Sequence, residues 1–212
     1  MHPTLRRAGG YAAIAAPILM WSGFFAAALS RHGYNLLTRP FSDLATRGTS
    51  NATLFDFGFF LVPGLLTAVV ALGLWFAGDA GRAWRFGAVL IGAAGLFLFA
   101  TGVFQQDPSR STAAILHGTV SQICFAIASV APVVLFAASL RDRHLGAPRQ
   151  AWLVTGIAAA LIEAAGVALR PITHYPDGLF QRPFTIALTV WFVATGAWLL
   201  RVRGGDGLAL AE

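Results

Sequence analysis

Six apolar runs, each about as long as a bilayer is thick, constrain this chain more than any other feature. A membrane-crossing helix needs about 20 mostly apolar residues, and only short polar segments separate the runs. The predicted spans are residues 11–30, 54–77, 86–104, 113–140, 151–169 and 183–200. We therefore predict an all-α, polytopic membrane helical bundle with six transmembrane helices, forming a single domain over residues 1–212.

Composition supports a membrane protein and argues against a cleaved leader. With 57% hydrophobic and 11% charged residues, the chain has too little polar surface to cover a soluble globule. Arg6 and Arg7 precede the first apolar run, as in a signal peptide. That run continues for about 20 residues, however, whereas the apolar core of a signal peptide has about 7 to 15. An uncleaved membrane anchor is the interpretation we adopt.

The basic residues exclude some functions and predict an orientation. None is lysine, which excludes Schiff-base chemistry, and the arginines flank the spans, where they meet lipid headgroups rather than nucleic acid. Under the positive-inside rule we expect both termini to be cytoplasmic. We expect the membrane to be the cell inner (plasma) membrane. The arginines assigned to the cytoplasmic side are Arg6, Arg7, Arg82, Arg85, Arg141, Arg143, Arg149, Arg201 and Arg203.

Polar side chains gather in three connections on the predicted outer side. These connections read SRHGYNLLTRPFSDLATRGTSN, QQDPSR and RPITHYPDGLFQR, whereas the cytoplasmic connections are short and basic. A site is therefore expected on the outer face. In the first connection we predict a short helix or turn after Pro40, ending at Gly48, with Ser42 or Asp43 either capping it or folded over the mouth of the bundle.

Three stretches resemble one protein family. They are GYNLLTRPFSDLATRGTSNATLFDFGFFLVPGLL, DPSRSTAAILHGTVSQ and GLFQR. They resemble the bacterial and archaeal membrane proteins labelled domain of unknown function 998, over most of the chain. Where that family often has Ser-Glu-Leu-Gly, this chain has Ser42, Asp43, Leu44 and Ala45. The resemblance implies a six-helix integral membrane protein and implies no activity.

The few polar residues inside the spans define a second group of candidates. His117, Ser121 and Cys124 recur at helical spacing on one stripe of the fourth span, and Gln122 lies on the adjacent stripe. His117 is either a structural histidine or a ligand-binding one. Glu163 should rotate into the bundle, toward His117, Ser121 or Gln122, because ionisable groups at membrane depth are costly.

Other span residues have structural interpretations. Asp56 is interpreted as interfacial. Trp75, Trp84, Trp152 and Trp198, near the cytoplasmic ends, are interpreted as belt and packing residues. Proline kinks can open a cavity between helices, and small residues allow close packing. The prolines are Pro17, Pro63 and Pro132, and the small residues are Ala88, Gly92, Gly156, Ala160 and Ala164.

The outer connections are predicted to converge on one polar pocket. Arg170 or Arg182 should pair with an acid there, and residues 170–182 should form a lid over a pocket reaching down to Glu163. The expected acids are Asp43, Asp107 and Asp177. The predicted ligand-binding residues are Glu163, His117, Ser121, Gln122, Arg170, Asp177, Gln181 and Arg182.

The sequence is compatible with two main functions. The first is binding or moving a lipid or small amphipathic ligand through this pocket, with membrane lipids as partners. The second is a lipid hydrolase or transferase with a His/carboxylate cluster, for which the catalytic candidates are His117, Asp43, Ser42, Asp107 and His174. No nucleophile-elbow pattern accompanies Ser42, and no metal-ligand spacing occurs, so we expect neither a metal nor another cofactor. A scaffold for another membrane protein is a third interpretation.

Overall fold

The computed structural model of the chain describes residues 2–77, 81–107, 109, 111–141, 147–169 and 177–201, and these residues contain no strand. It has six helical spans that are long and apolar enough to cross a membrane, as predicted. The spans are α1 (Pro3–Ser30), a second span made of α2 (Ala52–Phe55), the π-helix η2 (Asp56–Leu61) and α3 (Val62–Ala77), then α4 (Gly81–Val103), α5 (Thr112–Ser139), α6 (Arg149–Leu169) and α7 (Asp177–Arg201).

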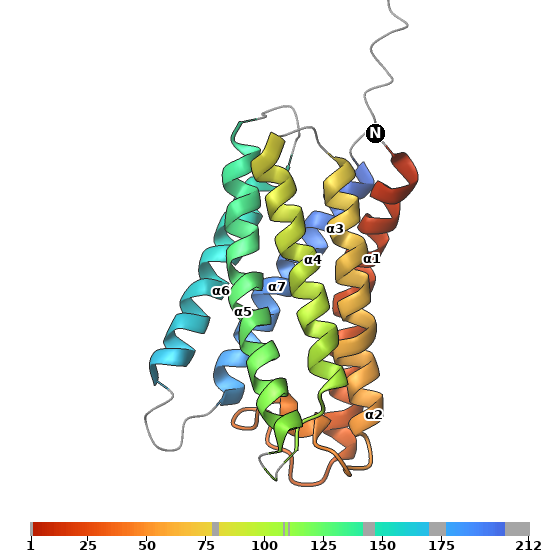
Figure 1. Cartoon of the computed structure of the whole chain (residues 1–212), viewed down its shortest axis with the longest axis vertical. Helices are drawn as coiled ribbons and strands as arrows, with labels where there is room; N and C mark the ends of the chain where they lie inside the picture. The colour runs from red at the N-terminus through yellow and green to blue at the C-terminus, as the bar shows by residue number, and fades with distance from the viewer. Residues whose placement is uncertain are drawn as a thin grey trace, which may run out of the picture.

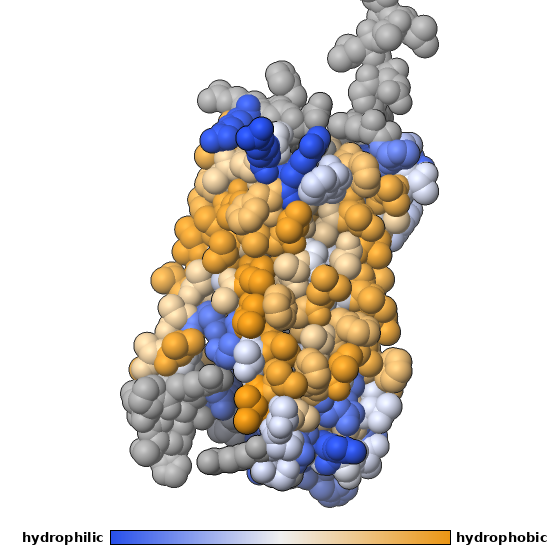
Figure 2. Space-filling model, viewed as in Figure 1, coloured by the Kyte–Doolittle hydropathy of each residue, from blue (hydrophilic) through white to orange (hydrophobic). Residues whose placement is uncertain are grey.

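The helices form a closed ring. Each packs against its neighbours in the order α1, α3, α4, α5, α6, α7, and α7 returns to α1. In Figure 1, α1 begins and α7 ends at the same end of the bundle, which we call the terminal end. The opposite end carries the connection between α1 and α2, and we call it the loop end. Figure 2 shows a broad apolar band between more hydrophilic ends, as a bilayer requires.

Glycines allow the tightest helix contacts. A Cβ placed on Gly64 of α3 would lie 2.8 Å from the carbonyl oxygen of Gly95 of α4, so only a residue without a side chain fits. Gly156 of α6 packs against Pro132 and Val133 of α5 in the same way. Lipid tails are as apolar as buried side chains, so such close backbone contact, rather than hydrophobicity, favours helix association in a membrane.

A tryptophan cluster fills the terminal end. Trp84, Trp152 and Trp198 are buried, and their ring centroids lie 5.6–5.8 Å apart. Trp152 Nε1 donates to Thr195 Oγ1 at 2.9 Å, and Trp84 Nε1 donates to the Leu74 carbonyl at 2.7 Å. Of the belt and packing interpretation, packing therefore holds for these three residues, which face the bundle, whereas Trp75 is 36% exposed.

The second half of the last polar connection is helical. We expected the sixth span to begin at residue 183, but α7 begins at Asp177. An acidic residue in the first turn is favourable because it faces the positive end of the helix dipole. Gly178, Gln181 and Arg182 are therefore held on a helix rather than on a loop. Arg170 and His174 lie outside the described residues.

Candidate functional site

A cavity of about 580 Å³ lies inside the ring and is lined by helices α1, α3, α4, α5 and α7. On α7 its lining residues run from Asp177 to Phe192, which at about 1.5 Å per residue is about 22 Å of helix. The tryptophan cluster lies beyond its deep end, toward the terminal end. The volume is in the range of about 300–1,000 Å³ that small-molecule sites occupy.

The lining of the cavity is mixed near the loop end, where its charged and amide side chains gather, and mainly apolar toward the terminal end. Near the loop end it includes Ser42, Asp43, Gln106, Asp177 and Gln181. Toward the terminal end it includes Ile91, Pro132, Leu188, Trp191 and Phe192. The cavity therefore has the polarity of an amphipathic molecule with its polar part at the loop end.

Two of the predicted kink prolines border the cavity. Pro17 lies inside α1 and Pro132 inside α5, and both line the cavity. A proline inside a helix removes one backbone hydrogen bond and pushes the preceding turn aside, so the axis bends there. Pro63 is buried on α3 but is not among the lining residues.

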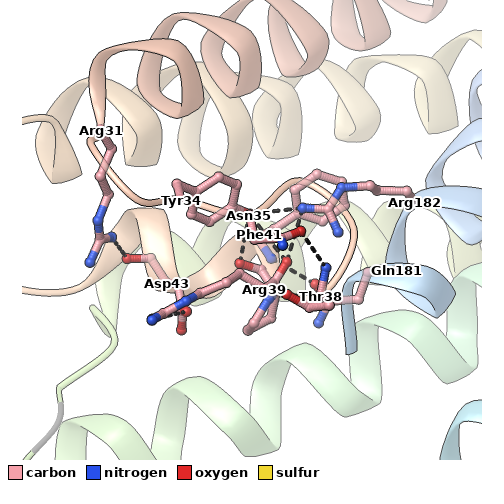
Figure 3. Close-up of polar contacts among 10 residues, drawn as sticks. Arg31, Tyr34, Asn35, Thr38, Arg39, Phe41, Asp43, Gln181 and Arg182 are labelled. Carbon is pink, nitrogen blue, oxygen red and sulfur yellow. Dashed lines mark hydrogen bonds and ion pairs between the residues drawn. The ribbon is translucent and has the colours of Figure 1, made fainter. Parts of the chain in front are cut away.

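Arg182 clamps the first connection onto α7, as Figure 3 shows. Its Nη2 donates to Tyr34 Oη and to the Arg39 carbonyl, both at 2.9 Å. Its guanidinium also lies over the rings of Phe24, Phe41 and Tyr34, 5.4, 5.1 and 6.0 Å from their centroids. We expected Arg170, Arg182 or both to pair with a carboxylate. Arg170 lies outside the described residues, and the hydrogen bonds of Arg182 go to a hydroxyl and a carbonyl inside an aromatic cage.

Two further residues of α7 support the same clamp. Gln181 Oε1 accepts a hydrogen bond from the Phe41 backbone N–H at 2.8 Å. A Cβ on Gly178 would lie 2.6 Å from the Leu37 carbonyl oxygen and 2.7 Å from that of Arg39, so a glycine is required there. The clamp holds η1 (Phe41–Ala45) over the mouth of the cavity.

Tyr34 is a neutral partner in this clamp. Burial raises the pKa of its hydroxyl to about 12, although the nearby Arg182 opposes the shift. The hydroxyl therefore keeps its proton at physiological pH and donates it to the Pro40 carbonyl at 2.9 Å. It can accept from Arg182 at the same time, because a phenol is both donor and acceptor.

The described parts of the three polar connections converge at the loop end, as predicted. The first meets the second where the Arg47 N–H donates to the Gln106 carbonyl at 2.8 Å, and it meets the start of α7 through Gln181. Asp43 pairs with Arg39 at 3.2 Å, and its carbonyl accepts from Arg31. Ser42 and Asp43 do not cap η1, whose N-cap is Pro40; both line the cavity mouth instead.

His117 and Ser121 line the cavity, and their polar atoms contact the loop end of α4. His117 Nδ1 lies 3.0 Å from the Thr101 carbonyl and 2.7 Å from that of Phe104, so Nδ1 carries the hydrogen. Ser121 Oγ donates to the His117 carbonyl at 2.7 Å and contacts Thr101 Oγ1 at 3.4 Å. The structural interpretation of His117 accounts for these contacts, and its other ring nitrogen, Nε2, is left as the acceptor.

Glu163 lies beside the main cavity rather than in it. It lines a smaller cleft of about 30 Å³ between α5, α6 and α7, together with Gln122 and Gln181. Of its three expected neighbours, only Gln122 shares this cleft, because His117 and Ser121 turn toward α4. Asp177, Gln122 and Gln181 line both spaces, so the cleft adjoins the cavity at its polar end.

Asp107 is placed apart from the cavity. It is not among the lining residues, and its Oδ1 accepts from Ser109 Oγ at 2.6 Å and from the Ser109 N–H at 2.9 Å. These hydrogen bonds, first from the hydroxyl and then from the N–H, lower the pKa of the exposed Asp107 carboxyl to about 2. Asp107 therefore serves in a local turn with Ser109. It is not one of the carboxylates that could act with His117 in the cavity.

We predict that Ser109→Ala raises the pKa of Asp107 toward its ordinary value of 3.8. A lowered carboxyl pKa stabilises the turn above the unfolded-state value, and that contribution is lost as the pH falls from about 4 through about 2. The Asp107 carboxyl carbon, followed by NMR from pH 6 to 1.5, reports the midpoint. Equal midpoints in wild type and Ser109→Ala would contradict this assignment, and Ser50→Ala is the matched control in another connection.

Asp56 is a buried residue that sequence reasoning placed at the interface. It is 2% exposed, and its Oδ2 accepts from Gln105 Nε2 at 2.6 Å. Its Oδ1 is buried without a hydrogen-bond partner in the described structure. Asp56 is the first residue of the π-helix η2. In the sequence, the signal for this buried acid was an aspartate directly after an apolar helix start. The π-helix had no signal in the sequence.

These contacts give no support to the hydrolase interpretation or to a metal site. No hydrogen bond joins Ser42 to His117 within the described ranges, although an activated nucleophile needs one. Within those ranges, no three side chains of His, Cys, Asp or Glu gather as a metal site would require.

Six apolar helices around an internal cavity define a multi-pass integral membrane protein. The model of the family described as protein of unknown function (DUF998) matches residues 14–198, and the chain belongs to that family. Neither the curated proteins nor the solved structures include one that matches this chain.

Proposed function

We propose that this protein binds or moves a lipid or small amphipathic molecule in the cavity within its helix ring. The observation that carries this is the change of the lining with depth, from Asp43, Asp177 and Gln181 to Leu188 and Phe192. A headgroup meets hydrogen-bonding partners at the loop end, and a hydrocarbon tail lies among side chains as apolar as itself.

The closed deep end favours binding over conduction through the bundle. The ring centroids of Trp152 and Trp198 lie 5.6 Å apart beyond the cavity, and Leu135 and Leu199 are fully buried with them. A molecule that fits the cavity therefore leaves toward the loop end or sideways, but not through the terminal end.

The test fills the cavity with a side chain. Ala128 lines it, whereas Ala126 on the same helix is exposed, so Ala128→Phe blocks the space and Ala126→Phe is the matched control. Gly118→Phe is a second blocking variant, because a Cβ on Gly118 meets nothing within 4 Å and the change introduces no clash at that atom. The full-length protein is reconstituted in phosphatidylcholine vesicles with a monoacylglycerol that carries a diazirine in its acyl chain.

Photolabelling of the protein by this probe is expected to fall at least tenfold in Ala128→Phe and Gly118→Phe and to be unchanged in Ala126→Phe. The labelled peptides of the wild type, read by mass spectrometry, are expected to come from cavity-lining segments. Equal labelling of these segments in all three variants and the wild type would overturn the proposal, as would the absence of saturable labelling there.

A further inference from the structure

The loop-end half of α6 stands away from its neighbours. The buried residues of α6 are Trp152, Thr155, Gly156 and Ala159, so no residue from 160 to 169 is buried, and in Figure 1 this part of α6 leans away from α5. Toward the terminal end the contact is closed, since Ala159 is fully buried and Gly156 packs on Pro132. Helices α5 and α6 therefore pack closely in their terminal-end halves and lie further apart in their loop-end halves.

A cleft lies between the separated halves of α5 and α6 and adjoins the cavity. It is the 30 Å³ space that holds Glu163, and Val167 lines it on the α6 side. Figure 2 shows hydrophilic residues between α5 and α6 within the apolar band, at the lower left. Polar groups at membrane depth are costly unless they face protein, water or a ligand, so the cleft marks a place where a polar head can lie.

Two phenylalanines stand between the cleft and the cavity. Phe125 of α5 and Phe184 of α7 line both spaces, and their ring centroids lie 5.0 Å apart in an edge-to-face contact. An edge-to-face aromatic contact is weak, so either ring can rotate, and its rotation would join the two spaces. At about 30 Å³ the cleft is too small for a lipid, so a lipid could pass only if side chains that line it moved.

We propose that the ligand enters the cavity sideways from the bilayer, between the loop-end halves of α5 and α6, past the Phe125–Phe184 pair. This inference rests on the proposed function and names the occupant of the cleft as a single-chain lipid of the surrounding leaflet. Its acyl chain passes between the two rings, and its head stays beside Gln122, Gln181 and Glu163. The apolar outer edge, Leu161 and Val167, faces the hydrocarbon layer from which such a chain comes.

The experiment measures how fast the photolabel reaches the cavity. Full-length protein in phosphatidylcholine vesicles is mixed with vesicles that carry the diazirine monoacylglycerol and irradiated at increasing times. Phe125→Ala and Phe184→Ala are expected to label cavity peptides about tenfold faster than wild type. Phe86→Ala removes a ring that is 55% exposed and lines neither space, and it is expected to leave the rate unchanged.

The outcomes separate this inference from the proposed function. One outcome is that Ala128→Phe blocks cavity labelling, while wild type, Phe125→Ala and Phe184→Ala are labelled at the same rate. This outcome would overturn sideways access and leave the binding proposal intact. No saturable cavity labelling in any protein would overturn both. A second arm supplies the same probe from the aqueous phase; faster cavity labelling from water than from the vesicle bilayer would also overturn sideways access.

Discussion

Arg182→Ala is expected to lower the free energy of unfolding by about 3 kcal/mol, because it removes hydrogen bonds and cation–π contacts together. The hydrogen bonds go to Tyr34 and Arg39, and the rings belong to Phe24, Phe41 and Tyr34. Arg182→Lys keeps the charge but has no planar fork, so we expect it to recover only part of the loss. The same change frees η1 from the mouth of the cavity.

Unfolding of the purified protein by SDS titration in mixed micelles measures this effect. Arg201→Ala is the matched control, since Arg201 is exposed in the last turn of the same helix. Gly178→Val tests the same clamp from the other side, because its Cβ meets the carbonyl oxygens of Leu37 and Arg39. If Arg182→Ala and Arg201→Ala unfold at the same SDS fraction, Arg182 does not hold the first connection.

Trp152→Ala should be comparably costly at the opposite end, by about 3–5 kcal/mol. Trp152 is fully buried and donates to Thr195, so its removal leaves both a void and an unpaired hydroxyl. Little of this cost is hydrophobic transfer, because the membrane is itself apolar; it is lost packing among Trp84, Trp191 and Trp198. The floor of the cavity would open with it.

Trp75→Ala is the control for Trp152→Ala. Trp75 lies near the same end but is 36% exposed, with Arg85 over its ring at 5.5 Å. We expect it to change the free energy of unfolding by less than about 1 kcal/mol. Equal destabilisation by the two substitutions, again measured by SDS titration, would show that the tryptophan cluster is not a packed floor.

The spans were predictable because their physics is local. A run such as 54–77 must bury its backbone hydrogen bonds inside itself when it crosses a bilayer, so length and apolarity alone indicate a helix. The stripe of His117, Ser121 and Cys124 was predictable for the same reason, and all three face α4 or the cavity. The polar connections were predicted to meet, and their described parts do.

Polar partners were predictable by kind but not by identity. A cation such as Arg182, beside several acids in the sequence, suggests an ion pair, yet its place in an aromatic cage depends on Phe24 and Phe41 arriving from α1 and η1. The buried Asp56 is bonded to Gln105, 49 residues further along the chain, and such a partner cannot be read from local composition. Whether Trp84 and Trp152 are belt or packing residues could not be read from the sequence, because depth along a helix is local information, whereas facing inward or outward is not.

The sequence by itself determined that this chain crosses a membrane six times, which residues are polar at membrane depth, and which prolines can bend a helix. Only the tertiary structure decided the order of the ring, the cavity bounded by Pro17 and Pro132, and the separation of Glu163 from His117 into two adjoining spaces. The reason is the range of the interactions: backbone hydrogen bonding within a span acts over four residues, whereas a cavity needs faces from helices far apart in the chain.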